Sequence, residues 1–184
     1  VKTALKQRLD YFASCGCRLS DQSFGSPDFT VWDEEAAQEA MNKALNGEKP
    51  LDYEVAAYQS LLMDFLGGVY AARGFTMQLH LGALRNLNTL RFRGLGPDVG
   101  CDSIGDGIPA ASLAALLDRL AVRDALPKSI LYTLNASDNE KLIAAAGCFH
   151  DGATAGKVQF GSAWWFNDHL DGMEKQLRDL ANIG

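Results

Sequence analysis

His80 is the residue best placed for chemistry in this sequence. It follows the apolar, β-prone run from Phe75 to Leu79, after which the composition changes to Gly, Asn, Arg and Pro. An imidazole at the carboxyl end of a strand could transfer a proton or bind a metal ion, because the strand ends of a barrel collect such groups. The same ring could instead be structural and bonded to a backbone carbonyl, and the residues alone leave both readings open.

Arg85 and an aromatic cluster are the candidates for ligand binding. Arg85 lies in a polar loop after His80, where its planar guanidinium could hold a carboxylate through two parallel hydrogen bonds, although a structural loop arginine is the alternative. Trp164, Trp165 and Phe166 follow a predicted strand, and sugars commonly stack on such rings. Core packing is the competing interpretation for these three side chains.

The remaining polar and sulfur-containing candidates are expected to be structural. His150 and His169 have no second histidine at ligand spacing and should be exposed, and Asp168 should cap the last helix. Three loop aspartates do not match a calcium-binding loop and suit turns: Asp98, Asp102 and Asp106. Four cysteines are expected to be reduced and to fill the core as small hydrophobic side chains: Cys15, Cys17, Cys101 and Cys148.

Composition narrows the function classes. The chain has 184 residues, of which 47% are hydrophobic and 22% charged, and a formal net charge of -6. These values are typical of a globular domain, and the excess of acidic residues argues against a nucleic-acid partner. The sequence shows neither a secretory leader nor an apolar stretch long enough for a bilayer, so we expect a cytoplasmic protein with no membrane partner.

Hydrophobic periodicity predicts alternating strands and helices. Strands are expected at 17–21, 75–79, 129–134 and 157–161. Helices are expected at 1–14, 33–45, 52–73, from 109 to about 120, from about 137 to 146, and through 177 and 180. Asp33 should cap the second helix, and Ser137 to Glu140 read as a capping box. The long segment 81–107 carries turn signals and few helix signals, which favours a functional loop.

This alternation predicts an α/β fold with a parallel sheet. A closed (β/α)8 barrel and an open doubly wound sheet both satisfy it, but the phosphate-binding glycine loops that the open sheet usually carries do not occur in the sequence. We therefore favour the barrel. Eight strands need about 200 to 250 residues, so about four β/α units here amount to a portion of a (β/α)8 TIM-type barrel with extra helices.

Three long strings carry a family resemblance. They are MQLHLGALRN at 77–86, LGPDVGCDSI at 95–104 and QFGSAWWFND at 159–168. With shorter matches at 128–135 and 171–173, they resemble uronate isomerase, the glucuronate and galacturonate isomerase family of the amidohydrolase superfamily, over essentially the whole chain. The resemblance implies a distorted (β/α)8 barrel and an aldose–ketose isomerisation, of D-glucuronate to D-fructuronate and of D-galacturonate to D-tagaturonate.

The resemblance also implies roles for the candidate residues. His80 is similar to the family's catalytic histidine at the end of a central barrel strand, beside a divalent metal ion that is often zinc, and is a candidate ligand of that metal. Arg85 and the Trp164–Trp165 pair are similar to positions that line the substrate, with the arginine on the C6 carboxylate and a tryptophan on the ring. The implied partner is a small uronic acid, and we expect a homo-oligomer.

Two departures from the family pattern concern the metal site. The family's HxH of the first barrel strand and the Thr-Asp-Ser-Arg string of its last strand have no counterpart in this sequence. We therefore expect 1–184 to be a single partial domain from the internal to C-terminal part of a barrel, inactive alone because one histidine cannot hold zinc. A metal-dependent hydrolase of the same superfamily and a non-catalytic assembly module stay open as alternatives.

Overall fold

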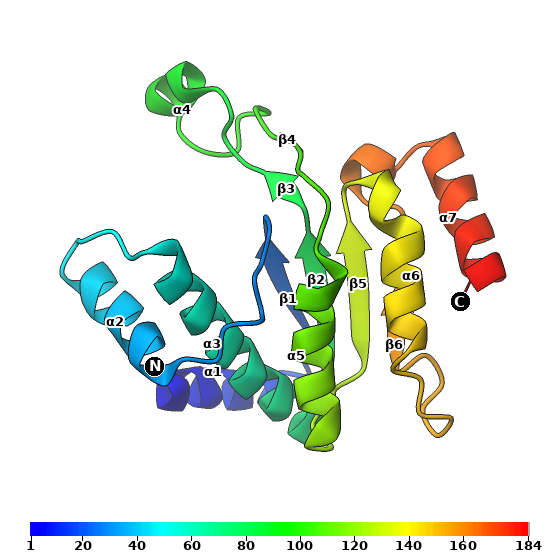
Figure 1. Ribbon diagram of the computed structural model, residues 1–184, viewed down its shortest axis with the longest axis horizontal. Coiled ribbons are helices and arrows are strands. Elements are labelled where there is room, and N and C mark those ends of the chain that lie inside the picture. The colour runs from blue at the N-terminus through cyan, green and yellow to red at the C-terminus, as the bar shows by residue number, and fades with distance from the viewer. Residues whose placement is uncertain (184) are drawn as a thin grey trace.

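Four parallel strands form the central sheet of the computed structural model, which describes residues 1–183 (Figure 1). The strands are β1 (Leu19–Phe24), β2 (Thr76–Leu81), β5 (Ser129–Thr133) and β6 (Val158–Phe160), in the order β1-β2-β5-β6. Each pairs in parallel with its neighbour in this order. The predicted α/β class and parallel sheet are confirmed, and at least one helix separates each of these four strands from the next of the four.

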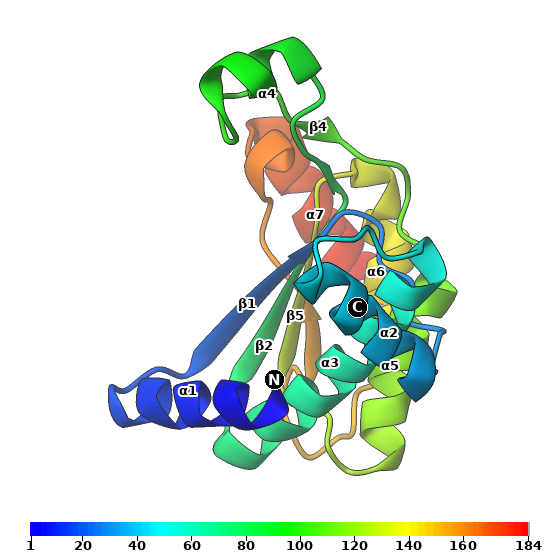
Figure 2. The ribbon, with the colours of Figure 1, turned by 90° about the vertical axis from the view of Figure 1, so that its left-hand side faces the viewer.

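Six longer helices accompany this sheet. They are α1 (Lys2–Ser14), α2 (Glu34–Leu45), α3 (Asp52–Arg73), α5 (Ala110–Val122), α6 (Asn139–Gly147) and α7 (Leu170–Ile183). Helices α3, α5 and α6 cover one face of the sheet, and α1 crosses below the amino-terminal ends of the strands (Figures 1 and 2). No helix lies over the opposite face within residues 1–183 (Figure 2). The sheet is therefore one-sided in the part of the chain that the structure describes.

The hydrophobic core lies between the sheet and these three helices. Every second residue of β2 faces it, so Met77, Leu79 and Leu81 are fully buried. Helix α5 presents four fully buried leucines to the same layer: Leu113, Leu116, Leu117 and Leu120. Gly67 lets α3 approach α5, because a Cβ atom at this position would lie 2.6 Å from Leu120 Cδ1. The apolar periodicity of the sequence thus predicted which residues of α5 face the core.

The other face of the sheet is polar. The alternation that buries one side of β2 turns Gln78 and His80 to the other, and the parallel register sets Asp21 beside Gln78 and Tyr132 beside His80. Gln159 of β6 occupies the same row as Gln78. This face of the sheet therefore carries polar side chains that no helix covers in the described residues, and it is the face on which a binding site can form.

Segment 81–107 forms a projecting arm at the carboxyl end of the sheet. The arm, residues 83–104, contains β3 (Ala83–Leu84), α4 (Thr89–Leu95) and β4 (Ser103–Ile104), and β3 pairs with β4 in antiparallel fashion. At its base Gly105 donates its N–H to Gly82 O at 2.7 Å, and a Cβ on Gly105 would lie 2.7 Å from the same oxygen. The expectation of a segment with little helix was wrong for α4, which Asn88 caps by accepting the N–H of Arg91.

Several local predictions need correction. The first strand begins at Leu19 and not at residue 17. The capping box at Ser137–Glu140 does not form, because the Asn135 side chain takes the Ser137 N–H and hydroxyl and starts a short 3-10 turn at Ala136–Asp138. All four cysteines are free, as predicted. Their predicted core role is wrong for Cys15 and Cys148, which are exposed, whereas the half-buried Cys17 packs against the core. Cys101 is half-buried.

No helix in the described part of the chain combines the length and the apolar character needed to span a bilayer.

Candidate functional site

His80 lies near the carboxyl end of β2, on the polar face of the sheet. Its side chain is 16% exposed, and Nδ1 lies 2.7 Å from Asp21 Oδ1 on the neighbouring strand β1. The imidazole stacks on the Tyr132 ring with 4.3 Å between centroids, and it packs against the Trp164 ring in an edge-on arrangement with 4.4 Å between centroids. Its neighbours are therefore polar and aromatic, and the ring is not sealed among aliphatic side chains.

The Asp21 contact determines which imidazole nitrogen carries the proton. An ionised carboxylate only accepts hydrogen bonds, so His80 donates from Nδ1 and the lone pair is left on Nε2. The structure gives Nε2 no hydrogen-bond partner within residues 1–183, and this nitrogen is free to accept a proton or bind a ligand. Sequence reasoning missed Asp21 as a site residue, because only the strand register brings β1 beside β2.

Tyr132 completes the polar cluster around His80. Burial raises the pKa of its phenol, and the negative charge of Asp21 raises it further. The phenol thus keeps its proton at neutral pH, and Tyr132 is neutral beside the imidazole.

Arg85 is held at the base of the arm. Its Nη1 donates to Asp102 Oδ2 at 2.9 Å, and its guanidinium lies 4.9 Å from the centroid of the Trp165 ring. The backbone N–H of Asn86, followed by Arg85, holds the pKa of Asp102 below its ordinary value. Asp102 therefore stays ionised and keeps the arginine in place, while 44% of the Arg85 side chain is open to solvent.

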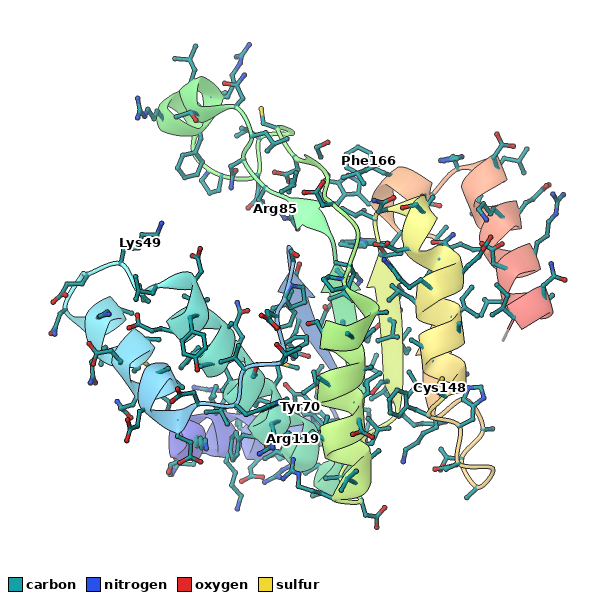
Figure 3. The ribbon with its side chains drawn as sticks, viewed as in Figure 1. Lys49, Tyr70, Arg85, Arg119, Cys148 and Phe166 are labelled. Carbon is teal, nitrogen blue, oxygen red and sulfur yellow. The ribbon has the colours of Figure 1, made fainter. Side chains whose placement is uncertain are left out.

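The aromatic cluster joins these two groups. Trp164 contacts His80, Trp165 lies under Arg85, and the two indole rings are 6.0 Å apart. Trp165 and Phe166 are 39% and 40% exposed, which rules out simple core packing for them. Figure 3 shows Arg85 at the base of the arm and Phe166 in the segment after β6, both at the carboxyl end of the sheet. The four residues predicted as a site, His80, Arg85, Trp164 and Trp165, are thus brought together.

Other candidates lie outside this cluster, as predicted for most of them. His150 is exposed and its Nε2 donates to Val158 O, and His169 is exposed at the start of α7. Asp168 was expected to cap α7, which is wrong, because His169 Nδ1 accepts the N–H of Gly172 in that place. The Asp102 carboxylate accepts hydrogen bonds from Arg85 Nη1 and from the backbone N–H of Asn86.

The described residues do not form a metal site by themselves. Stable zinc sites use at least three protein ligands. Within residues 1–183 no group of three or more His, Cys, Asp and Glu side chains could hold a metal ion. His80 offers only Nε2, since its other nitrogen is bonded to Asp21.

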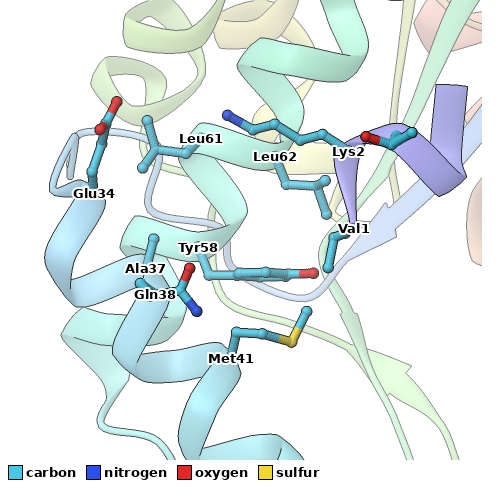
Figure 4. A pocket seen from close by; sticks show the side chains of 10 residues that line it. Val1, Lys2, Glu34, Ala37, Gln38, Met41, Tyr58, Leu61 and Leu62 are labelled. Atoms are coloured by element: carbon cyan, nitrogen blue, oxygen red, sulfur yellow. The ribbon is translucent and has the colours of Figure 1, made fainter.

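A separate groove of about 560 Å³ lies where α1 begins, between α2 and α3 (Figure 4). Apolar and aromatic side chains dominate its wall, with Met41, Tyr58 and Leu62 among them. None of the four predicted site residues lines this groove, so it is not part of the candidate site.

Comparisons with known proteins point to one family. The family model described as glucuronate isomerase matches residues 1–184. A uronate isomerase of Salmonella paratyphi B is 49% identical over 185 residues, which cover 100% of this chain and 39% of that protein. The chain therefore spans about 39% of the length of the curated relatives it matches.

Solved structures give the same picture. The uronate isomerase of Thermotoga maritima superposes with a TM-score of 0.85 at 31% identity, over 99% of this chain and 39% of that one. The glucuronate isomerase of Caulobacter crescentus superposes with a TM-score of 0.84 over 99% of this chain and 36% of that one. At 23% identity the second likeness concerns the fold alone.

Proposed function

The chain belongs to the glucuronate isomerase family, and on that premise we propose that it forms part of an enzyme that interconverts aldose and ketose uronic acids. The substrates would be D-glucuronate and D-galacturonate, with D-fructuronate and D-tagaturonate as products. The observation that carries the proposal is the continuous set of contacts from Asp21 and His80 through Trp164 and Trp165 to Arg85. It supports the proposal, because an imidazole that could transfer a proton and a guanidinium that could bind a carboxylate lie at one end of one sheet.

The two ends of this cluster suit the two ends of a uronic acid. The reaction moves the carbonyl from C1 to C2, which requires removal of a proton from C2 and delivery of a proton to C1. His80, with its proton on Nδ1 and its lone pair on Nε2, can accept or hold a proton beside the reacting carbons. Arg85 can bind the C6 carboxylate, and the tryptophan rings can pack against the apolar side of the sugar.

We propose that the four-stranded sheet is a portion of a (β/α)8 barrel whose polar face is the barrel interior. The helices on a single face support this, because a doubly wound sheet has helices on both. The superposition on the Thermotoga maritima protein also supports it. In this arrangement the carboxyl ends of the strands, where His80 lies, form the mouth of the barrel.

The β6 edge supports the same proposal. A groove of about 360 Å³ lies against β6 and α6, with Ile143, Val158 and Leu180 in its wall. On α7 the apolar residues Leu170 and Leu177 are 68% and 69% exposed, although Gln176 of the same helix is 3% exposed. An apolar stripe turned outward beside a strand edge is the surface that a further strand of the barrel would cover.

The expected divalent metal ion, with zinc as the first candidate, stays a prediction for the complete enzyme. The single lone pair of His80 Nε2 cannot bind the metal ion and accept a proton at once, so His80 would be a metal ligand only in place of its proton-transfer role, with the other ligands from outside residues 1–183. We expect the 184-residue chain to bind less than one equivalent of zinc after dialysis, measured by elemental analysis, and to show no turnover. Stoichiometric zinc on the isolated chain would contradict this assignment.

The function is tested in the complete enzyme that carries this segment. Incubation with D-glucuronate should give the ketose, detected by proton NMR, and His80→Ala should lower kcat/KM by about 10³-fold or more through loss of the proton-transfer group. The matched control His150→Gln replaces an exposed histidine outside the cluster by another side chain that can donate to Val158 O, and it should leave the rate within about threefold. A wild-type enzyme that hydrolyses ester or amide substrates and does not interconvert uronates would overturn the proposal.

A further inference from the structure

One contact of the His80 ring, its stack on Tyr132, can determine the plane in which the imidazole lies. The imidazole and the Tyr132 phenol ring are almost parallel, with an interplanar angle of 7° and 4.3 Å between centroids. The two residues are direct partners in the parallel register of β2 and β5, so their side chains leave the same face of the sheet side by side. Such offset or parallel stacking is a preferred contact between flat rings.

The Tyr132 ring is itself held on two sides. Its hydroxyl donates to Gln78 Oε1 at 2.9 Å, which fixes the outer end of the ring. Along one edge the ring lies against Gly161, where a Cβ atom would be 2.3 Å from Tyr132 Cε1 and 2.5 Å from Cδ1. Gly161 is not among the residues with positive φ, so the glycine is needed for space and not for backbone conformation. Any side chain at 161 would push the phenol ring away from its present position.

The other contacts of His80 leave the plane of its ring unspecified. A single hydrogen bond from Nδ1 to Asp21 fixes one atom, and the imidazole can still turn about that bond. Asp21 is 59% exposed, so its own side chain is only weakly restrained. Trp164 touches the imidazole with its ring inclined at 64°, which limits one direction of movement.

We propose that Tyr132 and Gly161 act together as positioning residues for His80. Gly161 makes room for the phenol ring, Gln78 holds its hydroxyl, and the flat face of the ring keeps the imidazole in one plane with Nδ1 on Asp21. The inference rests on the proposed function, because it concerns the histidine that the proposed reaction uses.

The first test is spectroscopic and does not depend on activity. In the full 184-residue chain, the carbon-bound imidazole protons of His80 should resonate upfield of those of His150 and His169, because they lie over an aromatic ring. Tyr132→Leu removes the ring and should move the His80 signals toward those of the two exposed histidines. Tyr132→Phe keeps the ring and should retain the upfield position. Gly161→Ala leaves residue 132 a tyrosine but moves its ring, and should therefore displace the His80 signals.

The outcomes decide the proposal. Far-UV circular dichroism shows which variants keep the fold. If Tyr132→Leu unfolds, the two single variants Tyr132→Phe and Gly161→Ala are enough to test the proposal. The proposal is overturned if the folded Tyr132→Leu chain keeps the wild-type His80 signals, or, where that chain unfolds, if Gly161→Ala keeps them. It is also overturned if Tyr132→Phe moves them as far as the loss of the whole ring.

The second test uses the complete enzyme. Tyr132→Leu should lower kcat about 10 to 100-fold, as is typical when a residue that orients a catalytic histidine is lost, and should leave KM within about threefold. Tyr132→Phe should restore kcat to within about threefold of wild type. If the wild-type enzyme fails to interconvert uronates, the proposed function fails, whereas the spectroscopic result on ring orientation still stands or falls by itself.

Discussion

Arg85 combines two contacts that few side chains can make together. Its guanidinium donates to Asp102 and lies over the Trp165 ring, and the planar fork of arginine suits both a carboxylate and an aromatic face. Because the backbone N–H of Asn86 and then Arg85 lower the pKa of Asp102, the ion pair persists at neutral pH and is lost only as the pH falls through that lowered value. A substrate carboxylate would therefore meet an arginine whose orientation is already fixed.

Replacing Arg85 tests its part in substrate binding. Arg85→Lys in the complete enzyme should raise KM for D-glucuronate about 10 to 100-fold with a smaller change in kcat, because an ammonium group cannot bind a carboxylate through two parallel bonds or stack on indole. Arg91→Lys is the matched control, since Arg91 is exposed on α4. Equal KM values for the two variants would remove Arg85 from the proposed substrate site.

At the scale of elements, Glu54 connects two helices. Its Oε2 accepts the Leu51 N–H at the start of α3, and its Oε1 accepts from Lys43 of α2 at 2.6 Å. The Lys43 hydrogen bond, followed by that backbone N–H, lowers the pKa of Glu54, and the same contact raises the pKa of Lys43. One carboxylate therefore caps α3 and joins it to α2.

This arrangement predicts a pH-dependent stability. A lowered folded-state pKa means that the Glu54 contribution is present above the unfolded pKa of about 4.3 and is lost as the pH falls through the folded value. Glu54→Gln should thus lower the thermal midpoint by a few degrees at pH 7, and the difference from wild type should shrink toward pH 3. The exposed Glu48→Gln is the control, with little effect at either pH. A difference that stays constant from pH 7 to pH 3 would contradict the role of the Glu54 charge.

The base of the arm predicts a second effect at this scale. A methyl group on Gly105 would lie 2.7 Å from Gly82 O, so Gly105→Ala should disturb the hydrogen bond that closes residues 83–104. We expect limited trypsin digestion after Arg91 and Arg93 to become several-fold faster. Gly147→Ala is the matched control, because a Cβ there meets no atom within 4 Å and the residue lies on α6, outside the arm that is cleaved. Identical digestion rates for the two variants would show that the glycine pair does not hold the arm.

How much of this could be predicted from the sequence varies between elements. Periodic leucines gave α5 and apolar runs gave the strands, because burial on one face repeats at a fixed spacing. Residue type and position after a predicted strand made His80 and Arg85 candidates, and the resemblance implied their roles. Asp21 required the pairing of β1 with β2, which local patterns do not contain. The predicted capping box does not form because the Ser137 hydroxyl donates to Asn135 Oδ1. Both Asn135 and Ser137 can cap a helix, and residue types alone do not decide between them.

At the scale of the whole molecule, the outer strands β1 and β6 each pair with one neighbour only in the part of the chain that the structure describes. Gly161 donates its N–H to Leu131 O of β5, so by alternation the N–H groups of Val158 and Phe160 point away from β5. Within residues 1–183 no strand pairs with β6 on that side. The expected homo-oligomer stays a prediction, and it is one way in which such edges are covered.

Hydrogen exchange tests whether the barrel closes in the complete enzyme. In the 184-residue chain the Val158 and Phe160 amides should exchange at least about 100-fold faster than those of Met77 and Leu79 in the central strand β2. In the complete enzyme all four amides should be protected. If Val158 and Phe160 exchange equally fast in both proteins, the sheet ends at β6 and the barrel proposal is wrong.

The order of the strands in space is also their order along the chain, from β1 through β2 and β5 to β6. During synthesis on the ribosome, each strand that emerges after β1 finds its neighbour already made, and no later strand has to insert between two earlier ones. The nascent protein can thus assemble in the direction of translation. Until the following strand is made, the last strand of the nascent sheet has an unpaired edge, which chaperones can bind.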